Sequence, residues 1–257
     1  MSKKVYVGVD GCSAGWFTVF LATENEKDCR WKVGLFPKIS SLIDFLNKEY
    51  EQAEFLVLID IPIGLKAGGS GERLSDLGGR RILKARKSSI FPVPCREAVY
   101  VESYEKACEI NEKLTGKRIS KQAWNIVPKI RDVDNFLVEN KIFREKVKEV
   151  APEICFQAFT GFPMKSSKKS FDGFSERMKA LRSVCLFTDG IVEAALSEYR
   201  RKEVAKDDIL DALAAAITAK MGCRYGFEYV PGEPETESKG LKIQMVYCIP
   251  KSNSKLI

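Results

Sequence analysis

The chain has 257 residues, of which 45% are hydrophobic and 30% charged, and its formal net charge is +7. A chain of this size can bury the core of one domain and still carry an insertion. It has no histidine at all, which excludes histidine-based catalytic triads, histidine-ligated zinc and imidazole acid–base catalysis. Any catalysis must therefore use carboxylates, lysines, hydroxyls, thiols or metal-bound water.

The sequence gives no sign of a membrane or of an oxidising compartment. No apolar run approaches the roughly 20 residues that span a bilayer, and the N-terminus reads as a strand rather than as a signal peptide. The eight cysteines lie far apart without a Cys-x-x-Cys pair, which predicts mostly buried thiols. We therefore expect a cytoplasmic protein that does not contact a membrane.

The first quarter of the chain alternates between extended and helical patterns. Apolar, partly β-branched runs at 4–10, 15–23 and 31–36 predict three strands, and their short connections favour an antiparallel meander. Apolar residues at helical spacing predict a helix over 40–50. The continuous apolar run at 55–60 is typical of a strand that is buried on both faces. The predicted order is β-β-β-α-β.

Residues 62–146 are too many for a simple connection between two elements. We predict a mainly helical subdomain there, inserted into a single domain over 1–257, with helices over 103–114 and 120–140. Two stretches of the insertion contain lysines and arginines but no acid, namely 80–96 and 113–131. These stretches are either solvated faces or a surface that contacts phosphates.

The pattern after the insertion again alternates. The expected elements are a strand over 147–151, helices over 152–159, 175–187, 191–201 and 207–221, and a final strand over 243–249 at an edge of the sheet.

Acidic residues stand at the ends of three of these elements. Asp10 and Asp60 close two strands that become neighbours in a sheet wound in this order, which brings both side chains to one rim. Asp208 and Asp211 are three residues apart on a helix and so share a face. The small residues 212–216 that follow would let this helix lie close against the sheet. Buried carboxylates need a cationic partner, so the pattern predicts a metal site made of these four aspartates.

Each aspartate also has an ordinary structural interpretation. Asp207 or Asp208 could cap the start of its helix, since carboxylates are favoured there. Asp10 and Asp60 could each begin a turn. The coincidence of two strand ends and a late helix is what favours metal binding.

Ligation by carboxylate oxygens alone selects hard ions, which makes Mg²⁺ or Mn²⁺ the expected cofactor. Two such ions about 4 Å apart can activate a water and stabilise the leaving oxygen of a phosphodiester without an imidazole. Lysines and arginines of the insertion would then hold neighbouring phosphates. The expected function is metal-dependent hydrolysis of nucleic acid, DNA or RNA.

This order of elements resembles the RNase H fold, an α/β fold with three antiparallel strands, then parallel strands, flanked by helices. Its enzymes carry an acid on the first strand, another on the fourth, and one or two more on a late helix. Asp10, Asp60 and the Asp208-x-x-Asp211-Ala-Leu-Ala motif match those positions, and the last motif is similar to that of Holliday-junction resolvases.

More closely, the chain resembles the domain of unknown function 429 family, described as predicted RNase H-like nucleases. The residues that carry this resemblance are Gly8-Val9-Asp10-Gly11, Gly15-Trp16, Ile59 to Gly64, Ser88 to Phe91 with Pro94 and Arg96, Ser120-x-Gln122, Pro152-Glu153 with Phe156, Lys168-Lys169 with Gly173 and Arg177, and Asp208 to Ala215.

The resemblance implies nuclease activity and adds site residues. Glu153 joins the four aspartates as a catalytic candidate, and it either ligates a metal or binds an arginine of the insertion. The candidate phosphate contacts are Lys168, Lys169, Arg177 and Arg96. The family usually has a histidine before the Pro-Glu pair, where this chain has Ala151, so no such histidine is required here.

Two other functions stay open. Actin-like phosphotransferases share the core, and both the Asp10–Gly15 turn and the Asp76–Gly79 segment could be read as phosphate loops, although 257 residues leave no room for the duplicated fold. A catalytically silent nucleic-acid-binding module is the second alternative, in which Phe91, Tyr100, Tyr104 and Trp124 could stack on bases. The oligomeric state is open, with a homodimer as one option.

Overall fold

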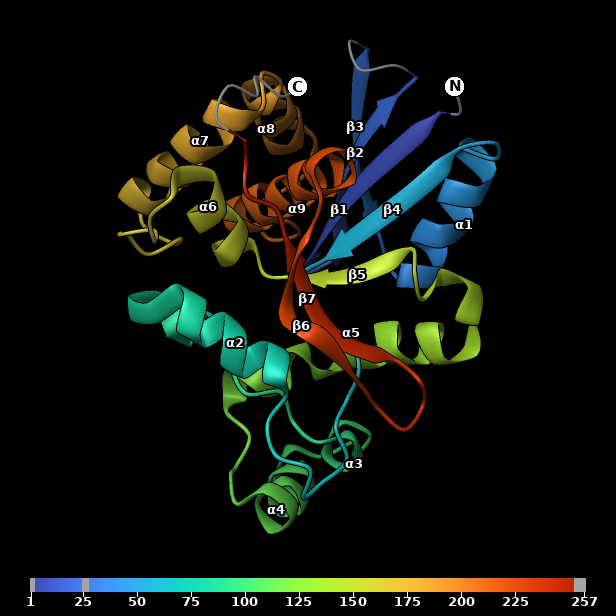
Figure 1. Cartoon of the computed structure of the whole chain (residues 1–257), viewed down its shortest axis with the longest axis vertical. Helices are drawn as coiled ribbons and strands as arrows, with labels where there is room; N and C mark the ends of the chain where they lie inside the picture. The colour runs from blue at the N-terminus through green and yellow to red at the C-terminus, as the bar shows by residue number, and fades with distance from the viewer. Residues whose placement is uncertain (1–2, 25–27, 252–257) are drawn as a thin grey trace.

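The protein is built on one mixed sheet of seven strands, ordered β3-β2-β1-β4-β5-β7-β6 within the described residues (Figure 1). The computed structural model describes residues 3–24 and 28–251. The strands are β1 (Lys4–Cys12), β2 (Gly15–Thr23), β3 (Cys29–Phe36), β4 (Glu54–Ile59), β5 (Val147–Val150), β6 (Glu228–Thr236) and β7 (Lys242–Tyr247).

Strand pairing follows the predicted order. β1 pairs antiparallel with β2, and β2 with β3, which confirms the meander. β4 lies parallel to β1 on its other side, and β5 and β7 continue the parallel part. The α/β class with antiparallel strands followed by parallel strands is therefore confirmed, and it is consistent with an RNase H-like fold.

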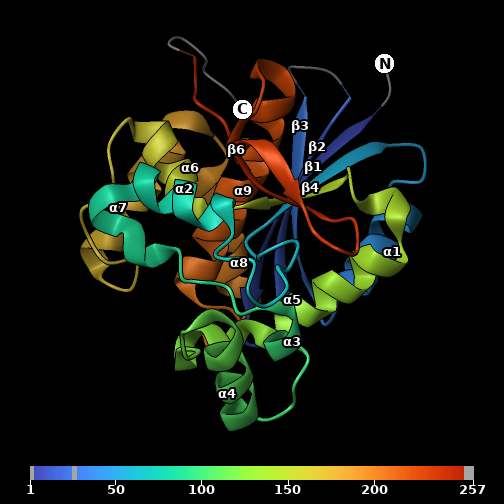
Figure 2. The same ribbon diagram turned by 60° about the horizontal axis from the view of Figure 1, so that its bottom comes forward.

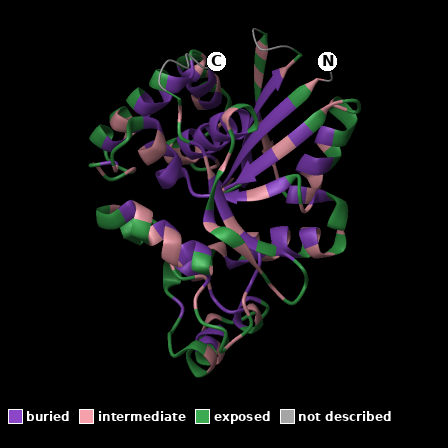
Figure 3. Cartoon of the chain, in the orientation of Figure 1, coloured by how far each residue is buried: buried purple, intermediate pink, exposed green. Residues whose placement is uncertain are grey.

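Helices cover both faces of the sheet, and the burial pattern explains why (Figures 1 and 3). Val5, Val7 and Val9 of β1 belong to one apolar cluster, together with α1 (Ile39–Glu49) and α5 (Lys121–Glu139). Tyr6 belongs to the cluster on the other face, because successive side chains of a strand point to opposite faces. That second face is covered by α6 (Pro152–Thr160), α7 (Phe171–Val184), α8 (Thr188–Glu198) and α9 (Lys206–Tyr225).

The segment between β4 and β5 is mainly helical, and most of it lies to one end of the sheet (Figures 1 and 2). α5 returns from it to pack on the sheet, whereas α3 and α4 form a small apolar cluster with Ile119 and with Ala123 at the start of α5. Its elements are α2 (Leu74–Leu83), the 3₁₀ helix η1 (Lys84–Ser89), α3 (Arg96–Val99), α4 (Tyr104–Thr115), α5 and the 3₁₀ helix η2 (Lys141–Phe143).

Two details of local structure differ from the sequence-based interpretations. Asp76–Gly79, which the phosphotransferase alternative reads as a phosphate loop, is part of α2. Gly78 and Gly79 are tolerated in this helix because side chains of Val230 and Ile90 fill the space where a Cβ would stand. The final strand, β7, lies inside the sheet between β5 and β6 rather than at its edge.

The expected state of the cysteines is confirmed. All eight are free thiols, and only Cys223 is exposed while Cys29 is half-buried. Among the described residues, no helix combines the length and the apolar character that crossing a bilayer would require.

Candidate metal centre

Asp10 and Asp60 lie side by side where the parallel pairing of β1 and β4 ends, although β1 itself continues to Cys12 beside β2. β1 and β4 run parallel with Val9 opposite Ile59, and the backbone N–H of Asp60 donates to the carbonyl of Val9 at 2.9 Å. Both aspartates follow residues whose side chains face α1 and α5, so their own side chains point to the opposite face. That face is the one covered by α9.

Asp211 reaches the same point because α9 packs unusually close to β1. A Cβ at Gly8 would lie 2.0 Å from the carbonyl oxygen of Ala212 and 2.2 Å from the nitrogen of Ala216. Only glycine permits this approach of helix backbone to strand backbone. Gly8 precedes Asp10 by two residues and Asp211 adjoins Ala212, so the close contact brings the two carboxylates together.

One carboxylate oxygen from each of Asp10, Asp60 and Asp211 lies within 4.8 Å of the other two. Hard divalent ions bind oxygen at about 2.0–2.6 Å, so ligands on opposite sides of one ion stand about 4–5 Å apart. Asp10 and Asp211 are buried and Asp60 is half-buried, so the group is shielded on most sides. The arrangement has the donor type and the spacing that such an ion requires.

The electrostatics of the three aspartates are those of a site that lacks positive charge. Burial raises the pKa of Asp10 well above its ordinary value, and the neighbouring Asp60 and Asp211 raise it further. Burial and the charge of Asp211 raise the pKa of Asp60 to about 7. Burial also raises the pKa of Asp211, against the effect of Lys168. Each carboxylate thus favours the arrival of a cation.

Lys168 is the cation that meets this group in the structure. Its ammonium donates to Oδ2 of Asp211 at 2.8 Å and lies 3.5 Å from Oδ2 of Asp207. The charge of Asp211 is the main cause that raises the pKa of Lys168 far above its ordinary value. Lys168 therefore carries one positive charge beside three acids, and its side chain is 40% exposed. The neighbouring Lys169 is exposed on the same loop.

Asp208 was expected as a fourth ligand, but it is not part of the group that comes within 4.8 Å. Its Oδ2 accepts a hydrogen bond from the backbone N–H of Ala205 at 2.8 Å, at the start of α9. Burial raises its pKa to about 6, and this hydrogen bond works against that rise. The helix-start interpretation thus describes Asp208 better than the ligand interpretation, while Asp207 does not cap the helix.

Glu153 binds arginines, as one of its two interpretations expected. Oε1 accepts from Nε of Arg86, a residue of the insertion, at 2.9 Å. Arg177 donates from Nη2 to both oxygens of Glu153, at 2.7 and 3.0 Å. Glu153 is not in the group of ligand oxygens that the three aspartates form.

Two of the expected phosphate contacts are engaged elsewhere. Arg177 is fully buried, so its guanidinium holds Glu153 rather than facing a substrate. Arg96 forms ion pairs with Asp134 at 2.7 Å and with Glu237 at 3.0 Å. In this structure both guanidinium groups are therefore paired with carboxylates of the fold, and their contact with phosphate stays a prediction.

Glu149 and Arg73 were not singled out from the sequence. Glu149 of β5 is 2% exposed, accepts from the backbone N–H of Ile63 at 2.7 Å and is paired with Arg73. Asp76 lies on the other side of Arg73, 3.3 Å from Nη1. Burial raises the pKa of Glu149 to about 7. A glutamate within the short apolar run at 147–151 was the available signal.

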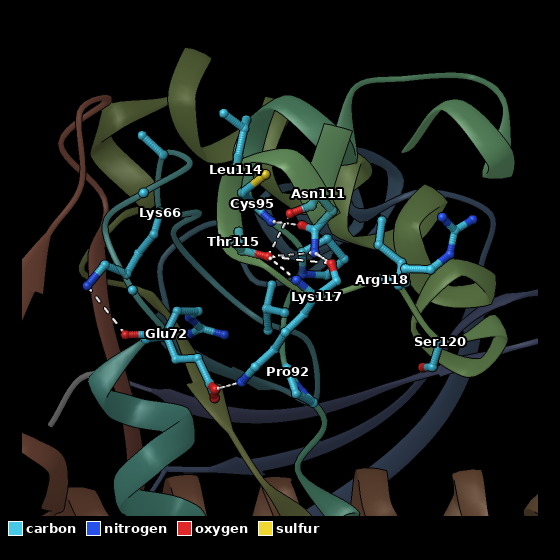
Figure 4. A pocket seen from close by; sticks show the side chains of 17 residues that line it. Lys66, Glu72, Pro92, Cys95, Asn111, Leu114, Thr115, Lys117, Arg118 and Ser120 are labelled. Atoms are coloured by element: carbon cyan, nitrogen blue, oxygen red, sulfur yellow. Dashed lines mark hydrogen bonds and ion pairs between the residues drawn. The ribbon is translucent and has the colours of Figure 1, made fainter. Parts of the chain in front are cut away.

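A cavity of about 430 Å³ lies in the insertion, and none of the three aspartates lines it. Its cations are matched by acids: Lys66 pairs with Glu235 at 2.7 Å, and Figure 4 shows the side chain of Lys117 meeting Glu72. Arg118 at its rim pairs with Glu112. Several charges of the basic stretches are thus neutralised within the protein, which weakens the view of this region as a phosphate-binding surface.

Comparison with known families assigns the chain to a family. The family model described as "Protein of unknown function (DUF429)" matches residues 8–236. The chain belongs to the DUF429 family. The matched region contains Asp10, Asp60 and Asp211. Searches of curated proteins and of solved structures each found no match to the chain.

The stability of this DUF429 protein without divalent ions is expected to fall as pH rises. The raised pKa of Asp60, about 7, means that the folded state keeps a proton that the unfolded chain loses near pH 4. The contribution of Asp60 to the free energy of unfolding is therefore fully present below pH 4 and is lost as pH rises through 7. Melting temperatures in chelator at pH 5.5 and pH 8 would measure it.

The matched control is Asp60→Asn, which cannot titrate. The variant should lose less stability than wild type between the two pH values, and at pH 8 it should melt above wild type. Equal pH dependence in the two proteins would show that Asp60 is ionised throughout.

Proposed function

We propose that the protein is a nuclease that hydrolyses phosphodiester bonds of nucleic acid with Mg²⁺ or Mn²⁺. The observation that supports this most is the convergence of Asp10, Asp60 and Asp211 from β1, β4 and α9 onto one point. Oxygen ligands alone favour these hard ions over zinc. When bound, the ions supply the activation of a water and the stabilisation of the leaving oxygen.

The charges around the site fit a divalent ion. The three aspartates carry three negative charges when ionised, and Lys168 supplies one positive charge. Two negative charges are then left without a counterion, which is the charge that one divalent ion balances. In the proposed mechanism Asp10, Asp60 and Asp211 would hold the metal, and Lys168, whose side chain is 40% exposed beside Asp211, would contact a phosphate of the substrate.

Arg86 is a second candidate for the phosphate. Its side chain is 26% exposed and is held by Glu153 through Nε, so the rest of the guanidinium is oriented by a fixed partner. Guanidinium groups bind phosphate well in this way, because their planar donors match its oxygens. Arg86 comes from the basic stretch at 80–96, so one member of that stretch stays in the proposed substrate site.

The test is a cleavage panel of single-stranded, duplex, hybrid and branched substrates, each with Mg²⁺, Mn²⁺ or chelator. We expect cleavage of at least one class with either ion and none in chelator. The Asp10→Asn protein, purified in parallel, controls for contaminating nucleases. Cleavage that persists in Asp10→Asn, or in chelator, would contradict the proposal.

The same preparations separate the alternatives. Turnover of ATP without cleavage of any nucleic acid would support the phosphotransferase, although the helical state of Asp76–Gly79 removes one of its two loops. Calorimetric titration with Mn²⁺ addresses the silent module: wild type that binds no ion and cuts nothing, yet retains nucleic acid, would favour it.

A further inference from the structure

The loop between α6 and α7, taken together with the first residue of α7, combines positive charge with exposed aromatic rings. Residues 161–171 read Gly-Phe-Pro-Met-Lys-Ser-Ser-Lys-Lys-Ser-Phe and contain three lysines and no acid. Phe162 is 73% exposed and Phe171 is 82% exposed. In the adjoining α6, Phe156 and Phe159 are buried. The same segment thus places some aromatic rings in the core and leaves others in solvent.

The exposed positions of Phe162 and Phe171 do not stabilise the fold. Burial of a phenylalanine side chain would stabilise the protein by about 1.5–3 kcal/mol. Ile142 and Leu186 are the other large apolar side chains among the described residues that are more than 70% exposed. They lie in separate parts of the chain, whereas Phe162 and Phe171 flank one loop, which points to a shared use.

The loop is held in place rather than free. Glu176 of α7 accepts hydrogen bonds from the backbone N–H groups of Lys165 and Ser166, at 2.8 and 2.9 Å. Buried Arg177 donates to the carbonyl of Ser166 at 3.3 Å. At its far end Ser170 accepts from the backbone N–H of Gly173 at 3.0 Å and caps α7. The backbone that carries both rings is therefore ordered.

The loop also borders the metal centre directly. Lys168 from its middle donates to Asp211 at 2.8 Å. Lys165 and Lys169, on either side, are exposed and carry their charges at the surface. The segment that contacts Asp211 thus also carries exposed positive charge and two exposed rings.

We propose that the loop 161–171 binds unpaired nucleotides of a nucleic acid beside the metal centre, with Phe162 and Phe171 stacking on bases and Lys165 and Lys169 contacting phosphates. This rests on the proposed nuclease function and names its substrate class. Phenylalanine has no hydrogen-bonding group with which to read base edges, and the faces of bases are open only where they are unstacked. Single strands and flaps offer such faces, whereas a continuous duplex hides them.

The experiment measures binding without cleavage, by fluorescence anisotropy with a labelled 20-nucleotide single strand and the matching duplex. All proteins carry Asp10→Asn, and the buffer contains chelator. The test variants are Phe162→Leu and Phe171→Leu, alone and combined, because leucine keeps an apolar side chain but removes the ring. Leu186→Ala and Ile142→Ala are the matched controls, since these exposed side chains lie outside the loop.

Each phenylalanine variant should weaken single-strand binding about five-fold or more, the low end of what one base–aromatic stack contributes. The controls and duplex binding should change by less than two-fold. Single-strand affinity that is unchanged in the combined variant overturns the proposal, as does equal weakening in the controls. Loss of binding to anionic lipid vesicles, with nucleic-acid binding unchanged, would identify a membrane surface instead and also overturn it.

Failure of this proposal and failure of the nuclease function are separable. Wild type that cleaves the panel while the phenylalanine variants bind normally would refute the stacking loop alone. Wild type that cleaves nothing but binds single strands through the two rings would refute the nuclease and support the loop. A protein that binds no nucleic acid under any condition refutes both.

Discussion

Asp10→Asn is expected to abolish both metal binding and cleavage while leaving the fold intact. The substitution changes almost no volume, but it removes one of three converging negative charges at a buried position. Even outer-shell partners of a metal cost about 10–100-fold in affinity or activity when they are lost. A direct ligand should cost more, so cleavage should fall by more than about 100-fold.

Calorimetry with Mn²⁺ and thermal melting separate this effect from unfolding. Asp10→Asn should bind Mn²⁺ too weakly to titrate, yet in chelator it should melt at or above the wild-type temperature, because Asp60 and Asp211 lose a like-charged neighbour. The control is Asp189→Asn, which breaks an exposed ion pair with Arg182 and should change neither property. Wild-type Mn²⁺ affinity in Asp10→Asn would refute the metal centre.

Gly8→Ala is expected to be among the most damaging single-methyl changes in the sheet. Its Cβ would overlap the backbone of α9, 2.0 Å from the carbonyl oxygen of Ala212, and backbone atoms cannot rotate away. Either α9 shifts away from β1 or the protein unfolds. Overpacking of a core typically costs about 1–3 kcal/mol and occasionally more, and this contact belongs at the upper end.

The comparison variant is Gly232→Ala on β6, where a Cβ meets nothing within 4 Å. Urea unfolding should show a large loss of stability for Gly8→Ala and little change for Gly232→Ala. If Gly8→Ala folds, it should also bind Mn²⁺ more weakly, because Asp211 moves with α9. Wild-type stability together with wild-type Mn²⁺ binding would show that the helix does not set the position of Asp211.

Much of the site was predictable because it depends on short-range patterns. Asp10 and Asp60 end apolar runs, and their sharing of one rim follows from strand order alone. The small residues 212–216 indicated that α9 would lie close to the sheet, as it does. The spacing of apolar residues and the size of the side chains were sufficient for these predictions, because they determine which face of a strand or helix packs against its neighbour.

The rest depended on contacts between distant segments. Lys168 and Asp211 are 43 residues apart, and nothing in either local pattern predicts their bond. The helical state of residues 76–79 was missed because glycine disfavours helices, and here packing against Val230 and Ile90 outweighs that preference. β6 was missed because Pro231, Gly232 and Pro234 are poor strand formers, which an edge strand tolerates.

The pairing of Glu149 with Arg73 has a consequence for how this family can vary. The acid belongs to the sheet and its cation to the insertion, and both are 2% exposed. A shortened relative without residues 62–146 would keep this acid inside its core without Arg73 and without the backbone N–H of Ile63, and removal of one partner of a buried ion pair typically costs about 3–5 kcal/mol. A family member that lacks the insertion should therefore also have another residue in place of this glutamate. The residue at position 149 should then indicate whether the insertion is present.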